Sequence, residues 1–255
     1  DDLAYRFGIA MGKEMKAVGI NMDYAPVLDV HSNPENPIIG KRAISSNPEV
    51  VARLGCKIIQ GFKDAGTFPV GKHFPGHGDT SQDSHLTLPR VEKSKESLEK
   101  MELFPFAQAF QEGLDLIMTA HVVYPAWDEN SAATFSKYIL NDILRKKMNF
   151  QGLVMSDDLE MQAVTQTPEE LPALAINAGV DLFLICHDLD KVTRLQDAMI
   201  DGIETGKIPH KTVDNSFNRI MKSKEKLTDD KEIDLKQILG ENQKLAEEMR
   251  SYLTE

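Results

Sequence analysis

The chain has 255 residues, of which 41% are hydrophobic and 27% are charged, and its formal net charge at pH 7 is −11. This composition is typical of a soluble globular protein, and the length suits one α/β barrel as well as two small domains. The acidic balance argues against nucleic acid or an anionic membrane as a partner, because both attract an excess of Lys and Arg. We therefore expect a small molecule as the partner.

Helix and strand patterns alternate from the first residues onward. Apolar residues recur at about a 3.6-residue period over 2–18, which predicts a helix, and the apolar run 20–30 predicts a strand buried on both faces. The alternation continues with helices over 48–65, 95–112, 137–148 and 169–178 and with strands over 67–72, 114–119, 152–156 and 180–185. Two helices are expected within 188–226, followed by an amphipathic packing helix over 231–254.

Five strands that alternate with helices predict parallel βαβ units, whose loops after the strand carboxyl ends build the active site. Five strands do not close a barrel and leave sheet edges exposed, so we expect further strands before residue 1. No repeat or low-complexity linker interrupts the pattern. We expect one domain over residues 1–226 and a helical extension over 227–255.

The two cysteines, Cys56 and Cys186, lie far apart in apolar helix-like and strand-like contexts. This placement predicts buried free thiols rather than a disulfide framework. No run of 18 apolar residues is present, so no membrane segment is expected.

The loop after the predicted strand 67–72 concentrates titratable side chains. His73 and His77 have the spacing of a helical zinc motif, but Pro75 and Gly76 between them forbid a regular helix, and no HExxH glutamate is present. We therefore expect no metal at this pair. An extended backbone at Asp83-Ser84-His85 would place carboxylate and imidazole on the same side, where the carboxylate can stabilise the protonated ring as a proton-transfer dyad.

Asp157 and Asp158 follow the predicted strand 152–156. The first carboxylate after a barrel strand points at the substrate and could act as a nucleophile, while its neighbour would hold the loop. The alternative is that both residues cap the following helix. The spacing alone does not decide between them.

Four further polar residues could be functional or merely structural, and two of them carry two interpretations. Arg42 could bind vicinal hydroxyls or a carboxylate with its planar fork, or be an ordinary surface arginine. His121 could line the pocket at a strand end, or be a hydrogen-bonded core histidine. Asp23 and Asp29 could simply bond loop backbone.

Four sequence blocks together resemble a known family. They are Tyr24-Ala25-Pro26-Val27-Leu28-Asp29-Val30, Ile39-Gly40-Lys41-Arg42, Lys72-His73-Phe74-Pro75-Gly76-His77-Gly78 with Asp83-Ser84-His85, and Ser156-Asp157-Asp158-Leu159-Glu160-Met161. These blocks are similar to those of glycoside hydrolase family 3, specifically the NagZ-type bacterial β-N-acetylglucosaminidases, also called β-hexosaminidases. The likeness spans about residues 3–225, and Met118-Thr119-Ala120-His121 fits it as well.

The resemblance implies a role for six residues. Asp157 would be the nucleophile, His85 the general acid/base and Asp83 its dyad partner, and Arg42, Lys72 and His73 would hold a terminal N-acetylglucosamine. It implies a retaining glycosidase that needs no cofactor and no metal, acts on a saccharide such as a peptidoglycan-derived muropeptide, and works in the cytoplasm. Nothing in the sequence indicates the oligomeric state.

The resemblance also implies a (β/α)8 TIM-type barrel, of which the five strands would be the last. A family motif of the form D-Q-E-G-G-x-V-x-R, which grips the sugar, would precede residue 1, so about three amino-terminal strands would be absent from this chain. Three alternatives stay open: a family 3 glycosidase or phosphorylase with another sugar preference, a metal-dependent barrel hydrolase using His73, His77, His121 and Asp157, or a truncated inactive sugar-binding remnant.

Overall fold

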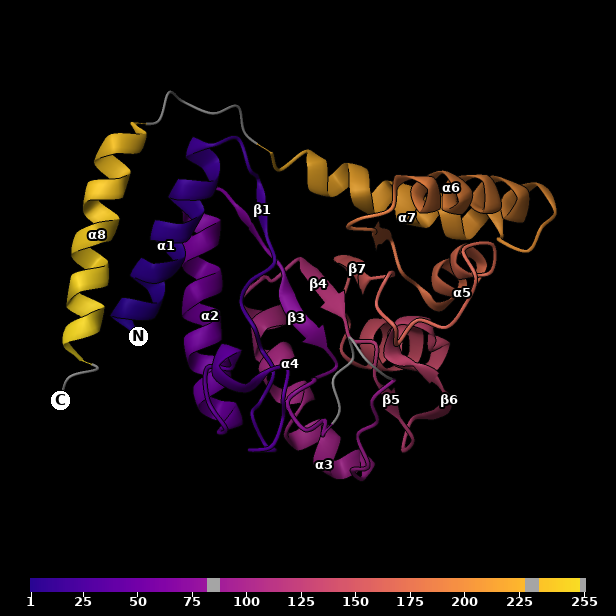
Figure 1. Ribbon diagram of the computed structural model, residues 1–255, viewed down its shortest axis with the longest axis horizontal. Helices are drawn as coiled ribbons and strands as arrows, with labels where there is room; N and C mark the ends of the chain where they lie inside the picture. Colours follow the sequence, from indigo (N-terminus) through magenta and orange to yellow (C-terminus); the bar gives the residue numbers. More distant parts are fainter. Residues whose placement is uncertain (82–87, 228–233, 253–255) are drawn as a thin grey trace.

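The computed structural model describes residues 1–81, 88–227 and 234–252. Its centre is a four-stranded parallel sheet in the order β3-β4-β7-β8 (Figure 1). These strands are β3 (Gly71–Phe74), β4 (Leu116–Thr119), β7 (Leu153–Asp158) and β8 (Leu182–Leu184). The parallel register pairs Ile117 with Gly71 on one side and with Val154 on the other. The predicted α/β class with parallel strands is confirmed.

The first predicted strand is much shorter than expected. Only β1 (Met22–Asp23) pairs, in parallel with β2 (Phe68–Pro69), and a single further bridge joins Val27 to Lys72. Pro26 lacks the N–H that a continuous ladder needs. The predicted strand 67–72 is likewise divided into β2 and β3, because Pro69 also lacks a ladder donor. Within the described residues the sheets do not close into a barrel.

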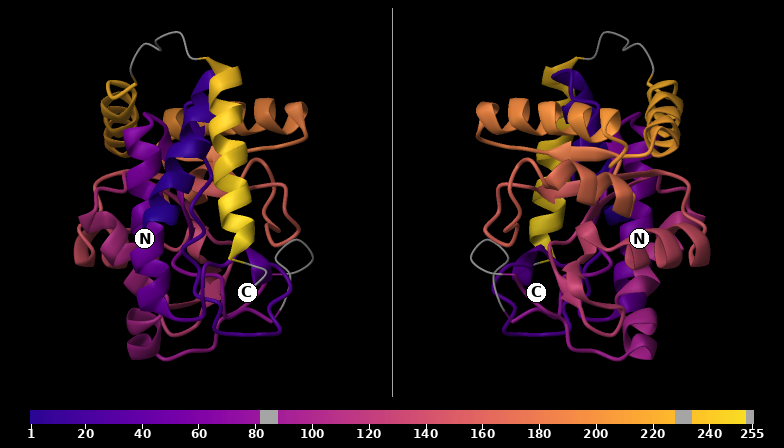
Figure 2. Two further views of the ribbon diagram at one scale, coloured as in Figure 1. Left: turned by 90° about the vertical axis from the view of Figure 1, so that its left-hand side faces the viewer. Right: turned by 90° about the vertical axis from the view of Figure 1, so that its right-hand side faces the viewer.

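Helices pack against both faces of the parallel sheet and against one another. They are α1 (Asp2–Ala17), α2 (Pro48–Asp64), α3 (Lys95–Lys100), α4 (Leu103–Gln111), α5 (Leu171–Ala178), α6 (Leu189–Glu204), α7 (His210–Lys224) and α8 (Leu235–Ser251). Figure 1 shows α1 and α8 at one end of the molecule and α5–α7 at the other. The helix α8 lies along α1, where Arg6 Nη2 is 2.6 Å from Glu248 Oε2 (Figure 2).

Helices α1 and α2 approach each other at backbone distance. A Cβ built on Gly8 would lie 2.3 Å from the carbonyl oxygen of Ile58, and one on Gly61 would lie 2.3 Å from that of Tyr5. Only glycine fits such a contact. The amphipathic helix α2 therefore packs against α1 as well as against the sheet.

Three local features differ in detail from the sequence pattern. The predicted helix 95–112 is broken into α3 and α4 at Met101 and Glu102, where the buried Glu102 carboxylate binds Lys93 Nζ at 2.6 Å. The connection after β4 contains an antiparallel hairpin, β5 (Val123–Tyr124) with β6 (Asp128–Ala132), that the sequence pattern did not indicate. The next helix, η3 (Tyr138–Lys147), is wound as a π-helix and follows the short 3-10 turn η2 (Ala133–Phe135).

Both faces of the parallel sheet are buried. Ile117 and Val154 face the larger cluster beneath the helices, whereas Met118 and Met155 face a smaller one. This alternation follows from the period of two along a strand. The predicted strands 114–119 and 152–156 are thus confirmed, whereas the run 20–30, predicted to be a strand buried on both faces, leaves Ile20 and Tyr24 exposed.

A buried charge network ties the start of β8 to the helices. The Asp181 carboxylate is fully buried and accepts hydrogen bonds from Arg145 Nη2 (3.0 Å), Arg219 Nη2 (2.7 Å), Ser216 Oγ (2.6 Å) and the Val154 N–H (2.9 Å). The partners come from three elements: Arg145 from η3 (Tyr138–Lys147), Ser216 and Arg219 from α7, and Val154 from β7. The network lies at the amino-terminal end of the strands, the end of a parallel α/β fold associated with stability rather than chemistry.

The prediction for the cysteines holds only in part. Both thiols are free, and Cys56 is half-buried, but Cys186 is exposed because β8 ends two residues before it. In the part of the chain that the structure describes, no helix is long and apolar enough to cross a bilayer.

Candidate active site

Side chains from two non-adjacent strands meet at the carboxyl end of the sheet. His73 lies in β3 and Asp157 in β7, with β4 between them, and His73 Nε2 is 4.0 Å from Asp157 Oδ2. The guanidinium of Arg42, from the short helix η1 (Gly40–Arg42), reaches the same imidazole, with Nη2 3.5 Å from Nε2. The structure therefore brings together three of the six predicted site residues.

Asp29 holds His73 in this position. Its fully buried carboxylate accepts the His73 N–H (3.1 Å), the His77 N–H (2.7 Å) and the His73 Nδ1–H (2.7 Å). Because Nδ1 is used as the donor to Asp29, Nε2 is the nitrogen that faces Arg42 and Asp157. Asp29 thus does more than bond loop backbone, which was the interpretation that the sequence suggested.

The Asp157 carboxylate is held in its ionised form. Burial alone favours the neutral acid, but the neighbouring His73 and His121 and a backbone N–H outweigh it and lower the pKa of Asp157 below its usual value. That N–H belongs to Asp158 and lies 2.8 Å from Asp157 Oδ1. The carboxylate is 20% exposed, so it is partly desolvated and still accessible.

Lys72 brings a second cation to the site. Its Nζ lies 5.9 Å from the centre of the Tyr24 ring, and it interacts electrostatically with Asp157. Burial and then the like charge of Arg42 lower the pKa of Lys72, against the opposing pull of the carboxylates. Lys72 thus interacts electrostatically with both Arg42 and Asp157, and its predicted role in holding the sugar stays a prediction.

His121 belongs to the core rather than to the pocket surface. It is 1% exposed, its Nε2 is 3.1 Å from the carbonyl oxygen of Asp158, and its Nδ1 is 2.8 Å from Thr134 Oγ1. Both ring nitrogens are therefore satisfied within the protein. Of the two interpretations left open by the sequence, the hydrogen-bonded core histidine is the one that the structure supports.

His77 is also buried, with its Nδ1 2.9 Å from Thr80 Oγ1. Burial and the neighbouring His73 lower the pKa of His77 to about 4, so its ring is neutral at neutral pH. The dyad residues Asp83 and His85 lie outside the described residues, and their predicted roles stay predictions.

One side-chain group has the spacing of a metal site within residues 1–81, 88–227 and 234–252. It consists of Asp158, Glu160 and His187, whose ligand atoms lie within 4.8 Å of one another. Glu160 already accepts the backbone N–H groups of Cys186 (2.7 Å), His187 (2.6 Å) and Asp188 (2.9 Å), so its carboxylate fastens the loop after β8. This group contains none of the residues that the metal-dependent alternative names.

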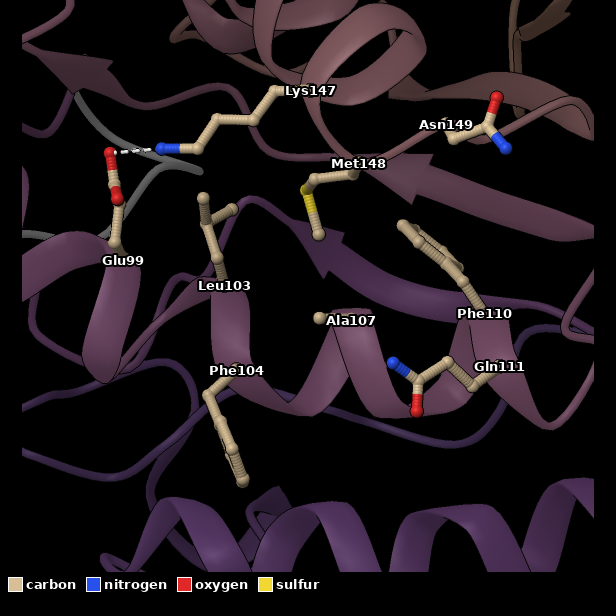
Figure 3. A pocket seen from close by; sticks show the side chains of 9 residues that line it. All are labelled: Glu99, Leu103, Phe104, Ala107, Phe110, Gln111, Lys147, Met148 and Asn149. Carbon is tan, nitrogen blue, oxygen red and sulfur yellow. Dashed lines mark ion pairs between the residues drawn. The ribbon is translucent and has the colours of Figure 1, made fainter.

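A separate hollow of about 490 Å³ lies in the helical layer, away from the strand ends. Figure 3 shows its walls, which come from α3, α4 and the end of η3, with Lys147 and Glu99 paired across it. None of the predicted site residues lines it. The hollow is therefore distinct from the cluster around Asp157.

Residues 1–223 match the family model described as "Glycosyl hydrolase family 3 N terminal domain". The chain belongs to glycoside hydrolase family 3. The family that the sequence resemblance suggested is thereby confirmed. The family 3 chain is 36% identical over 247 residues to "Beta-hexosaminidase A" of Pseudoalteromonas piscicida, covering 89% of this chain and 41% of that protein. It is 39% identical over 199 residues to "Beta-hexosaminidase" of Idiomarina loihiensis, covering 77% of this chain and 59% of that protein.

Solved structures of related proteins also match this chain. A "glycoside hydrolase family 3 beta-N-acetylglucosaminidase from Paenibacillus sp. str. FPU-7" matches with a TM-score of 0.87 and 41% identity over 88% of the family 3 chain and 43% of that chain. "Beta-glucoside phosphorylase BglX" matches with a TM-score of 0.84 and 28% identity, over 89% and 43% of the two chains. The family 3 chain thus spans between 41% and 59% of the length of these relatives.

Sequence reasoning missed two residues that shape this site. Asp29 orients His73, and Thr134 binds His121. A charged residue inside the apolar run Val27-Leu28-Asp29-Val30 was a signal for the first, because a buried carboxylate needs partners. No sequence signal pointed to Thr134.

Proposed function

We propose that this family 3 chain carries the catalytic and sugar-binding residues of a retaining exo-β-N-acetylglucosaminidase. The main observation is the ionised, partly exposed Asp157 carboxylate at the carboxyl end of β7, with His73 Nε2 at 4.0 Å. An ionised carboxylate at that place is what nucleophilic attack on an anomeric carbon requires. The relatives named β-hexosaminidase and the family 3 β-N-acetylglucosaminidase support the same reaction.

The proposed reaction has two steps. An oxygen of Asp157 attacks the anomeric carbon while the glycosidic C–O bond breaks, and His85 gives its proton to the leaving oxygen. Water then attacks the same carbon and loses a proton to His85, and the ester bond to Asp157 breaks. Asp83 would orient His85 and stabilise its protonated form.

Arg42, Lys72 and His73 are proposed to hold the sugar. Their guanidinium, ammonium and imidazole groups lie around Asp157, where they can hydrogen-bond sugar hydroxyls or the acetamido group and fix the ring. We further propose that terminal β-linked N-acetylglucosamine of peptidoglycan-derived muropeptides is the substrate, and that the strands described belong to a (β/α)8 barrel.

The decisive experiment traps the intermediate. The full-length protein is incubated with a 5-fluoro N-acetylglucosaminyl fluoride, digested and mapped by mass spectrometry. We expect the label on Asp157 and its loss in Asp157→Asn, whereas Asp158→Asn is the matched control that leaves the nucleophile in place. A label on another residue removes the assignment. Binding of the sugar without label or turnover identifies an inactive remnant instead.

The acid/base role needs a separate test, because it concerns a different residue. His85→Ala should slow the hydrolysis of substrates with leaving groups of high pKa far more than that of activated aryl glycosides, since only the former need proton donation. Equal losses for both substrate types would contradict this role.

A second candidate function is phosphorolysis. The structural neighbour titled "Beta-glucoside phosphorylase BglX" motivates it, with a TM-score of 0.84. Assays in phosphate buffer separate the two reactions, because phosphorolysis yields a sugar 1-phosphate and hydrolysis yields the free sugar. A sugar 1-phosphate as the main product would replace hydrolysis with phosphorolysis.

A further inference from the structure

A buried chain of hydroxyl groups and an imidazole reaches the strand end that carries Asp157. Thr119 in β4, His121 just after it and Thr134 in η2 are each at most 1% exposed. Thr134 Oγ1 lies 2.8 Å from Thr119 Oγ1 and 2.8 Å from His121 Nδ1. Such fully enclosed polar groups are costly unless each is satisfied, so their arrangement is restricted.

The geometry fixes where the ring proton of His121 lies. Nε2 is 3.1 Å from the carbonyl oxygen of Asp158, and a carbonyl only accepts, so Nε2 carries the hydrogen. Burial lowers the pKa of His121, against the opposing pull of Asp157, which leaves the ring neutral at neutral pH. Nδ1 is then an acceptor, and the Thr134 hydroxyl is its donor.

The remaining partners are consistent with this proton order. With the Thr134 proton directed to His121, Thr119 donates to Thr134 Oγ1. The carbonyl oxygen of Ala120, at 3.2 Å from Thr134 Oγ1, is a more distant acceptor for the same hydroxyl hydrogen. The ring is further held by Phe135, whose plane is within 6° of parallel at a centroid distance of 6.2 Å.

The backbone of residue 158 connects this chain to Asp157. The carbonyl of Asp158 accepts from His121, and the N–H of Asp158 donates to Asp157 Oδ1 at 2.8 Å. The two groups lie in successive peptide units joined at the Asp158 Cα, so fixing the carbonyl restrains the N–H through the φ and ψ angles of Asp158. That N–H is one of the contacts that keep the Asp157 carboxylate ionised.

From these contacts we infer that Thr134 is a positioning residue: its hydroxyl holds His121 as the Nε2–H tautomer, and this N–H fixes Asp158 and thereby the Asp157 carboxylate. The inference rests on the proposed role of Asp157 as nucleophile. It assigns a catalytic consequence to the β5-β6 connection, because η2 immediately follows β6 and delivers Thr134 to the site.

Thr134→Val tests the inference because valine has nearly the shape of threonine and lacks the hydroxyl. The variant leaves Nδ1 without a donor, so the ring can shift its hydrogen to Nδ1 and turn the Nε2 lone pair against the Asp158 carbonyl. We expect kcat to fall about 10- to 100-fold, as for other residues that fix a histidine tautomer from outside the site. KM should change less than about threefold, because Thr134 does not contact the sugar. Thr134→Ser should restore kcat.

Thr67→Val is the matched control. Thr67 is 2% exposed, and its hydroxyl donates to the carbonyl oxygen of Gly12 at 2.9 Å, away from the site. Thr67→Val removes one buried hydroxyl group, as Thr134→Val does, and should retain its kcat. An equal fall of kcat in both valine variants would make the effect of Thr134 a general loss of packing and overturn the inference.

Nitrogen-15 NMR of histidine-labelled full-length protein gives the readout that does not depend on activity. We expect His121 to be protonated at Nε2 in the wild type and to lose that tautomer in Thr134→Val, with Thr134→Ala as the second variant if valine prevents folding. A wild-type ring protonated at Nδ1 alone, or an unchanged tautomer in both variants, overturns the inference. A wild type that shows the expected tautomer but no turnover instead refutes the proposed function.

Discussion

Replacing Asp29 by asparagine should remove the hydrogen bond that orients His73 while keeping the shape of the side chain. Asparagine keeps one oxygen for the two backbone N–H groups that Asp29 Oδ1 accepts, but it places an NH₂ group against the His73 Nδ1–H. The charge-assisted bond at 2.7 Å is lost, which costs about 1.5–3 kcal/mol, and an unsatisfied buried donor adds about 1 kcal/mol or more. We expect Asp29→Asn to reduce the free energy of unfolding by about 3 kcal/mol at pH 7.

The direction of the Asp29 pKa shift determines how this loss of stability changes with pH. Burial opposes the charge, but His73 and His77 outweigh it and lower the pKa of Asp29 below the value of about 3.9 that an unfolded chain would have. A carboxylate with a lowered folded pKa stabilises the fold above pH 4 and loses that contribution as the pH falls through the folded value. The part of the stability gap between wild type and Asp29→Asn that comes from this carboxylate should therefore shrink as the pH falls below about 4.

Urea unfolding of the full-length protein, followed by circular dichroism at several pH values, measures this gap. Asp142→Asn is the matched control, since Asp142 forms an exposed i,i+4 pair with Lys146 and should change stability by less than about 0.5 kcal/mol. An Asp29→Asn protein as stable as this control at pH 7, or a gap that widens toward acid, would refute the reasoning. A loss of kcat/KM of about 10- to 100-fold should accompany the change if Asp29 orients His73 for the sugar.

Three other predictions concern stability and reactivity. Asp181→Ala leaves Arg145 and Arg219 without their buried counter-ion and should lower the free energy of unfolding by about 3–5 kcal/mol. The loss should appear as a lower thermal unfolding midpoint, and an unchanged midpoint would show that the network is dispensable. Gly78→Ala places a Cβ 1.8 Å from a backbone carbonyl oxygen and should lower both stability and activity. Gly240→Ala lies in an exposed helix with open space around it and should stabilise the protein by about 0.5–1 kcal/mol. A change of stability of the same sign in both variants would contradict the packing argument. Iodoacetamide at pH 8 should modify the exposed Cys186 before Cys56. Burial and then the nearby Glu112 raise the pKa of Cys56 to about 11, so little of its reactive thiolate is present. Peptide mapping that finds Cys56 modified first would refute this order.

The helices that could be predicted well are those with strong local signals. Helix α2 begins at Pro48 with Asn47 as its N-cap and ends at Asp64, one residue before the predicted end. Its cap, its proline in the first turn and its apolar stripe are all written in adjacent residues. The break at Met101 and Glu102 depends instead on the buried pair between Glu102 and Lys93, which the helical period does not contain.

The candidate site, too, could be predicted from the sequence only in part. Motif blocks singled out Asp157, His73, Lys72 and Arg42, and the structure places His73 and Lys72 beside the Asp157 carboxylate and Arg42 beside His73. The prediction that residues 1–226 form one domain stays a prediction beyond the family match to residues 1–223.

By itself the sequence determined the alternation of strands and helices, the family, and the identity of the residues at the strand ends, because periodicity, caps and motifs are local or are read block by block. Only the tertiary structure decided which of these residues touch. Asp29 acts on His73 across 44 positions of the chain, and Thr134 reaches the site through a hairpin with no local signal. The physical reason is that a buried polar group is defined by the partners that satisfy it, and those partners are brought together only when the chain has folded.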